Sequence, residues 1–323
     1  MDYLHGSDLK AILHSKRANI YYLEYCRVLV NGGRVEYVTD RGKEALYYNI
    51  PIANTSCLLL GIGTSITQAA VRDLVKAGVM IGFSGNGGTP LLAGTEPEIA
   101  CHFFSPQSEY RPTEYLQAWC QFWFDDDKRL QAAKLLQKAR LQFTLKMWQK
   151  HSWEFNINLL KEAVENYERE IEQCSNTQEL LLTEGRLTKK LYYFANQATL
   201  NEASFRRDST DSDYRKKDPT NRFLDHGNYL AYGLGATACW VLGLPHGLSI
   251  LHGKTRRGGL VFDAADIIKD GIVLPLAFIS ALSGDNEREF REKVIEVFRS
   301  LEVLDHIFEV LKEIANYQYE EKK

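Results

Sequence analysis

The chain has 323 residues, a length that favours two domains over one. Hydrophobic residues make up 45% of it and charged residues 25%, an ordinary composition for a globular protein with a sizeable core. The net charge is −3, which excludes a protein that binds nucleic acid through overall basicity. Contacts with DNA or RNA would have to come from local basic patches.

Neither the cysteines nor the apolar segments predict export or a membrane protein. None of the six cysteines stands in a Cys-x-x-Cys pair, so we expect buried thiols in a reducing cytoplasm and no cysteine-based zinc site. The N-terminal residues are too polar for a signal peptide. Residues 229–251 lack Asp, Glu, Lys and Arg, but their glycines and the Pro-His-Gly sequence at 245–247 oppose a membrane span. We predict a buried helix there, followed by a turn and a second short helix.

The first part of the chain has the pattern of β-strands. Residues 18–30 are rich in Tyr, Leu and Val, and a similar run follows the Asn-Gly-Gly sequence at 31–33, which predicts a β-hairpin. Further short strands are expected at 45–52, 57–60 and 79–83. Between the last two we predict a helix that is capped by Thr64 or Ser65 and ends near Lys76.

The pattern becomes helical from about residue 95. Apolar residues at helical spacing, with little Pro or Gly, predict helices at 114–126, 128–149, 152–173, 176–200, 226–243, 264–283, 286–299 and 301–319. The polar, charge-dense segment 205–222 interrupts them and is expected to be a loop. The predicted fold class is therefore α+β, with a β-rich N-terminal domain at 1–88, a linker at 89–94 and a larger all-α domain at 95–323.

Glu184 occupies an unusual position on one of the predicted helices. Residues spaced four and three apart place it on the same face as Leu180, Leu187 and Leu191, where a helical bundle normally has an apolar side chain. Burying an unpaired carboxylate is costly, so the residue requires a partner. That partner is either a metal ion or a Lys or Arg that the side chain reaches at the edge of the core.

Three further residues, His252, Asp263 and Asp266, stand close together in the sequence. As structural residues, Asp263 would cap a helix and Asp266 would lie in its first turn, near the positive end of the helix dipole. As functional residues, Asp263 and Asp266 would project to one side of that helix. Together with His252 and Glu184 they would offer three carboxylates and one imidazole. Such a set suits Mg²⁺ or Mn²⁺ in phosphoryl transfer. His246 is the weaker histidine candidate because it lies in a turn.

Basic residues accompany this group. A glycine-flanked loop between His252 and Asp263 contains the cations Lys254, Arg256 and Arg257. Other basic clusters include the residues Arg206, Arg207, Lys216 and Lys217, and the helical series Lys134, Lys138, Arg140, Lys146 and Lys150. Each cluster by itself fits a solvated surface, but their number in an acidic chain indicates a positive face that binds DNA phosphates.

These motifs resemble the CRISPR-associated integrase family, the catalytic subunit of spacer acquisition, and its subtype I-F branch in particular. The resemblance covers nearly the whole chain. It is most specific in Pro245-His246-Gly247-Leu248, Leu251-His252-Gly253, Phe262-Asp263 and Asp266, and includes the Glu184 helix and residues 228–233. It implies that Glu184, His252 and Asp266 bind a divalent metal, Mg²⁺ or Mn²⁺, and that Asp263 is a further acidic catalytic residue.

The resemblance also implies an activity and partners. The expected reaction joins spacer 3′-OH ends to the CRISPR repeat by transesterification, with endonuclease activity on branched DNA. The expected partners are DNA, a second copy bound through the N-terminal domain, and the second adaptation protein, which is fused to the helicase-nuclease in subtype I-F. Two alternatives remain: a general metal-dependent DNA endonuclease that uses the same residues, and a non-catalytic dimeric scaffold whose acidic residues are helix caps.

Overall fold

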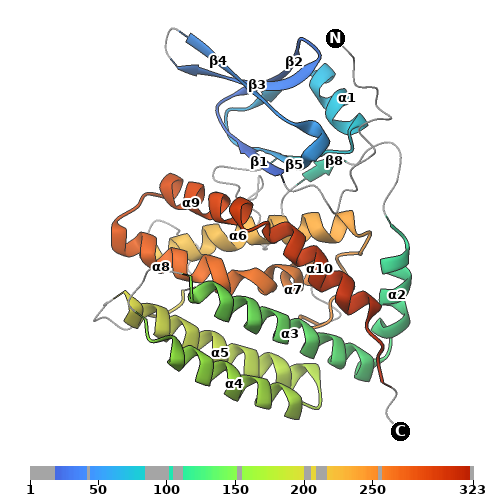
Figure 1. Cartoon of the computed structure of the whole chain (residues 1–323), viewed down its shortest axis with the longest axis vertical. Helices are drawn as coiled ribbons and strands as arrows, with labels where there is room; N and C mark the ends of the chain where they lie inside the picture. The colour runs from blue at the N-terminus through green and yellow to red at the C-terminus, as the bar shows by residue number, and fades with distance from the viewer. Residues whose placement is uncertain are drawn as a thin grey trace. The chain divides into compact units, whose positions relative to one another are not determined.

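The computed structural model describes residues 19–41, 44–83, 102–104, 112–150, 155–199, 205–208, 217–253 and 257–320. The chain divides into two compact units, Met1–Arg111 with β-sheets and Pro112–Lys323 with helices (Figure 1). The predicted α+β class, with strands first and helices after, is confirmed.

The first sheet of the N-terminal unit has the strand order β1-β5-β7-β8. Its strands are β1 (Asn19–Leu23), β5 (Thr55–Leu60), β7 (Met80–Phe83) and β8 (His102–Phe104). The first three are parallel and β8 is antiparallel to β7. Helix α1 (Gln68–Lys76) makes the crossover that parallel β5 and β7 require. Strand β5 is buried along nearly its whole length, as expected of a central parallel strand.

The second sheet has the order β4-β3-β2-β6. Its strands are β4 (Glu44–Asn49), β3 (Arg34–Arg41), β2 (Arg27–Asn31) and β6 (Ser65–Ile66). The predicted hairpin is confirmed as β2–β3, and its turn residues Gly32 and Gly33 have φ values of 56° and 80°, which glycine adopts without strain. The run 18–30 forms two strands in different sheets rather than one, because the chain turns at Tyr25, which has a φ of 48°.

One local prediction for this unit was wrong. Helix α1 is capped by Thr67, whose side chain accepts a hydrogen bond from the Ala70 N–H at 3.3 Å. Thr64 instead donates to the Gly61 carbonyl at 2.7 Å, and Ser65 belongs to β6. Strand β8 pairs with β7 and belongs to the first unit; the expected linker at 89–94 lies outside the described residues.

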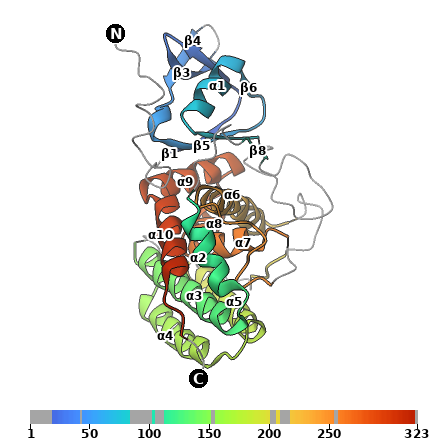
Figure 2. The same ribbon diagram turned by 90° about the vertical axis from the view of Figure 1, so that its right-hand side faces the viewer.

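The second unit is a helical bundle. Its elements are α2 (Glu114–Trp123), α3 (Asp126–Trp148), α4 (Ile157–Gln173), α5 (Thr177–Ala198), α6 (Pro219–Val241), α7 (Gly259–Ile268), the π-helical segment η6 (Lys269–Val273), α8 (Leu274–Ser283), α9 (Glu287–Ser300) and α10 (Val303–Asn316). Helix α7 is central: every residue of it is buried, and α3, α6 and α10 pack against it. Helices α4 and α5 form a hairpin beside α3 (Figures 1 and 2).

The region from α6 to α8 differs from the prediction. Helix α6 begins at Pro219 and not at residue 226, so the end of the segment expected to be a loop is helical. Residues 244–252 form turns and bends, not a second short helix. The helix predicted to begin at residue 264 begins at Gly259, so Asp263 lies inside α7 and does not cap it. The apolar period did not reveal this start because α7 is buried on all sides. Of the helices in the described part of the chain, none has the length and apolar character to cross a membrane.

Candidate active site

The loop between α6 and α7 is held by one buried carboxylate. Asp263 Oδ2 accepts hydrogen bonds from the Ser249 hydroxyl at 2.9 Å and from the backbone N–H groups of Ile250 and Leu251 at 2.7 and 3.2 Å. Its Oδ1 accepts from the His252 N–H at 3.2 Å. Asp263 is fully buried, so these donors replace water around its charge.

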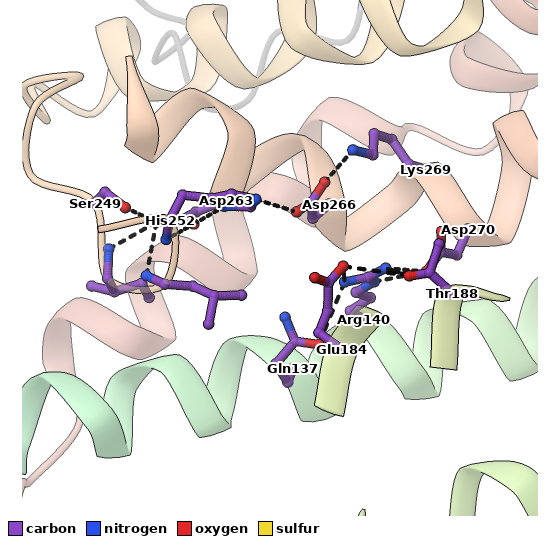
Figure 3. Close-up of polar contacts among 12 residues, drawn as sticks. Gln137, Arg140, Glu184, Thr188, Ser249, His252, Asp263, Asp266, Lys269 and Asp270 are labelled. Carbon is purple, nitrogen blue, oxygen red and sulfur yellow. Dashed lines mark hydrogen bonds and ion pairs between the residues drawn. The ribbon is translucent and has the colours of Figure 1, made fainter. Parts of the chain in front are cut away.

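The same carboxylate orients the imidazole of His252. Nδ1 lies 2.7 Å from Asp263 Oδ1, and Nε2 lies 3.5 Å from Asp266 Oδ2 (Figure 3). A carboxylate on Nδ1 fixes the proton there and leaves Nε2 as the nitrogen available for a ligand. Burial by itself lowers the pKa of His252, but the hydrogen bond to Asp263 and the charge of Asp266 outweigh it and raise the pKa.

Asp266 is buried and has a second cationic neighbour. The ammonium group of Lys269 forms an ion pair with its Oδ1. Burial by itself raises the pKa of Asp266, but the charges of Lys269 and His252 outweigh it and lower the pKa to about 2. The Lys269 ammonium also lies 5.2 Å from the centre of the Tyr232 ring. Lys269 is the first residue of the π-helical segment, a type of irregularity that is common at functional sites.

Glu184 lies in a neighbouring cluster, on α5. Its Oε1 accepts a hydrogen bond from Arg140 Nη1 of α3 at 2.7 Å, and Arg140 Nε donates to Asp270 Oδ2 at 2.7 Å. Figure 3 shows the side chains of Glu184 and Arg140 pointing toward one another. Of the two partners considered for Glu184, the structure therefore shows the arginine. Arg140 is only 2% exposed, so it belongs to the site and not to a solvated basic face.

A cavity of about 60 Å³ lies beside this cluster. Glu184, Lys269, Tyr192 and Asn228 contribute to its lining, so it contains both charged and hydrogen-bonding groups. Its volume exceeds what one water molecule requires.

The donor atoms fit Mg²⁺ or Mn²⁺ in kind. His252 Nε2 and Asp266 Oδ2 are adjacent, and Glu184 adds a carboxylate at the cavity. Within the part of the chain that the structure describes, however, no three His, Cys, Asp or Glu groups gather closely enough to hold a metal ion. Lys269 and Arg140 neutralise the carboxylates instead. A metal held by all three ligands would require these side chains to move closer together.

The predicted DNA-binding residues that the structure describes differ in their surroundings. Arg207 and Lys217 both form ion pairs with Asp225 of α6, which joins the segment 205–208 to that helix. Arg206 and Arg257 are exposed. The remaining candidates lie outside the described residues; they are Lys216, Lys254 and Arg256.

The sequence analysis did not single out Lys269 and Asp270, and it assigned Arg140 to a basic helical series and not to this site. Arg140 stands at helical spacing with the buried residues Leu136 and Phe143, the same signal that identified Glu184. Asp270 follows Asp266 by one helical turn.

Comparison with known proteins identifies the family. The profile of the family described as CRISPR associated protein Cas1 matches residues 23–294. Two proteins named CRISPR-associated endonuclease Cas1 are similar: that of Pseudomonas aeruginosa is 55% identical over 98% of both chains, and that of Pectobacterium atrosepticum is 53% identical over 96% of both.

Solved structures show the same fold. A CAS1 protein from Thermotoga maritima has a TM-score of 0.66 at 16% identity, covering 94% of this chain and 99% of that one. A casposase bound to integration product has a TM-score of 0.65 at 16% identity, covering 92% and 90%. The TtCas1–DNA complex has a TM-score of 0.59 at 21% identity, covering 93% and 97%. The resemblance stated from the motifs is thereby confirmed, and the chain belongs to the Cas1 family of CRISPR-associated endonucleases.

Proposed function

We propose that this protein is a metal-dependent DNA integrase of CRISPR adaptation. It joins the 3′-OH ends of spacer DNA to the CRISPR repeat by transesterification, and the same site cleaves branched DNA. The observation that carries the proposal is a partly buried histidine, His252, that is oriented by Asp263 and faces Asp266, in a chain of the Cas1 family. A carboxylate–histidine pair of this kind is the usual support of a metal ligand.

Glu184, His252 and Asp266 would hold the ion. When bound, Mg²⁺ or Mn²⁺ supplies charge neutralisation and polarisation of the phosphoryl oxygen under attack. The chain's own residues would support such an ion: Asp263 holds the proton of His252 on Nδ1 and so leaves Nε2 available as a ligand, while Lys269 and Arg140 pair with the carboxylates.

DNA and protein partners belong to the same proposal. The TtCas1–DNA complex and the casposase with its integration product share this fold, which supports DNA as the substrate. Exposed Arg206 and Arg257 are suited to phosphate contacts, together with Lys254, Arg256 and Lys216. The proposed protein partners are a second copy of this chain, bound through the N-terminal unit, and the second adaptation protein of subtype I-F. The proposed location is the cytoplasm.

A strand-transfer assay tests the proposal. The substrates are spacer-like duplexes ending in 3′-OH or in a dideoxynucleotide, with repeat DNA and the partner protein, in the presence and absence of Mn²⁺. We compare the wild type with Asp266→Asn and with Glu296→Gln, which changes an exposed carboxylate of α9.

Joined product that requires the metal, the 3′-OH and Asp266 supports the integrase. Nicking without joining would instead support the general endonuclease. A wild type that neither joins nor cleaves under these conditions, but still binds the partner, would support the scaffold.

A further inference from the structure

Two tryptophans of α2 bind the loop that carries His252. The indole Nε1–H of Trp119 donates to the Leu248 carbonyl at 3.0 Å, and that of Trp123 donates to the Ser249 carbonyl at 2.7 Å. Both side chains are buried: Trp119 is 0% exposed and Trp123 is 9% exposed. A buried indole N–H requires an acceptor, and here the acceptors are backbone groups only a few residues before the site histidine.

These bonds complete a set that fixes the loop from two sides. Asp263 of α7 accepts from the N–H groups of residues 250–252, while α2 donates to carbonyls of residues 248 and 249. The first turn of α7 also lies against the loop, because a Cβ on Gly259 would be 2.6 Å from the Ser249 Cβ. Residues 244–252 of the loop have no regular secondary structure, so these side chains satisfy backbone groups that a helix or sheet would otherwise pair.

A third indole makes the same kind of contact elsewhere in the site. Trp148 of α3 is 2% exposed, and its Nε1–H donates to the Asp270 carbonyl at 2.7 Å. Asp270 lies in the π-helical segment, where the regular helical ladder is interrupted. A phenylalanine would supply most of the same apolar surface at each position but no donor, so packing alone does not account for tryptophan.

We propose that Trp119 and Trp123 are positioning residues for His252. They do not contact the reacting atoms; they hold the loop so that Nδ1 of His252 meets Asp263 and Nε2 faces Asp266. The consequence for catalysis rests on the proposed integrase function. The positional role itself is a property of the fold and is measurable without DNA.

The test compares Trp119→Phe, Trp123→Phe and the double variant with Trp148→Phe, an equally conservative change at a buried tryptophan that bonds a different segment. The metal-free proteins are labelled with [¹⁵N]histidine, and the ring nitrogen shifts of His252, assigned with His252→Gln, report its tautomer at a pH where the imidazole is neutral. In the wild type and in Trp148→Phe we expect a single Nδ1–H form. In the double variant we expect a broadened or mixed signal, because the loop samples more than one position.

The kinetic readout is the strand-transfer assay. We expect kcat of the double variant to fall by about tenfold or more, since small misplacements of a catalytic group have large effects, while KM for DNA stays within about twofold. If the double variant does not fold, as judged by circular dichroism, the single variants give the same comparison.

A wild-type His252 signature in Trp119→Phe, Trp123→Phe and the double variant would overturn the proposal, whatever their activity. If the His252 signature changes in these variants but the wild type joins no DNA, the result supports the positioning role and counts against the integrase function alone.

Discussion

The buried carboxylate of Asp263 offers the sharpest prediction. Asp263→Asn keeps the shape of the side chain but removes its charge and replaces one acceptor oxygen with an NH₂ donor. In the structure the carboxylate faces five donors within 3.2 Å: the Ser249 hydroxyl, three backbone N–H groups and His252 Nδ1. One amide oxygen cannot accept all of them, and the new NH₂ would point at donors.

The expected loss follows from these contacts. Hydrogen bonds to a charged group contribute about 1.5–3 kcal/mol each, and a buried donor left unsatisfied costs about 1–3 kcal/mol. Because the loop can relax, we expect the free energy of unfolding to fall by about 3–5 kcal/mol and not by the full sum. His252 also loses the acceptor that fixes its tautomer, so Mn²⁺ binding should weaken by about 10–100-fold.

Urea unfolding measures the first effect and calorimetric titration with Mn²⁺ measures the second. Glu296→Gln is the control, since an exposed ion pair contributes at most about 1 kcal/mol. A loss below about 1 kcal/mol in Asp263→Asn, with unchanged Mn²⁺ affinity, would refute the reasoning that this carboxylate organises the loop.

Three other predictions follow from the charged groups. Arg140→Met should lower the free energy of unfolding by about 3–5 kcal/mol, because it leaves the buried carboxylate of Asp270 and the partly buried one of Glu184 without their shared cation, and urea unfolding measures the loss. The folded-state pKa of His252 is raised, so its positive charge stabilises the fold fully at pH values below the ordinary histidine pKa. This contribution is lost as the pH rises through the raised pKa. The free energy of unfolding, measured from about pH 5 to about pH 9, should show this dependence, and His252→Gln should remove it. Arg206→Ala should reduce the slope of the logarithm of the DNA-binding constant against the logarithm of salt concentration by about one. Arg207→Ala should instead lower the free energy of unfolding by about 1–2 kcal/mol, because Arg207 is paired with Asp225.

Each of these has an outcome that counts against it. Full stability in Arg140→Met would mean that the two carboxylates find other partners. A pH dependence that survives in His252→Gln would assign the titration to another group. An equal change of salt slope in both arginine variants would show that Arg207 contacts DNA in spite of its ion pair.

The sequence alone was sufficient for features that depend on neighbours along the chain. Alternation and helical spacing predicted strands followed by helices and placed Glu184 on an inward face, since these periods are properties of a single element. The hairpin at Gly32-Gly33 followed from turn chemistry. The motif around His252 indicated the family, which the comparisons confirm.

The tertiary structure alone decided which groups meet. Glu184 is paired with Arg140, which lies on another helix, and the role of Asp263 depends on a loop that precedes its own helix. The contacts from Trp119 and Trp123 have no local pattern, because their acceptors lie more than 120 residues away in the sequence. Spacing reveals which face of a helix is buried, but the partner of a buried charge or donor is set by how distant elements pack, and each such group must find one.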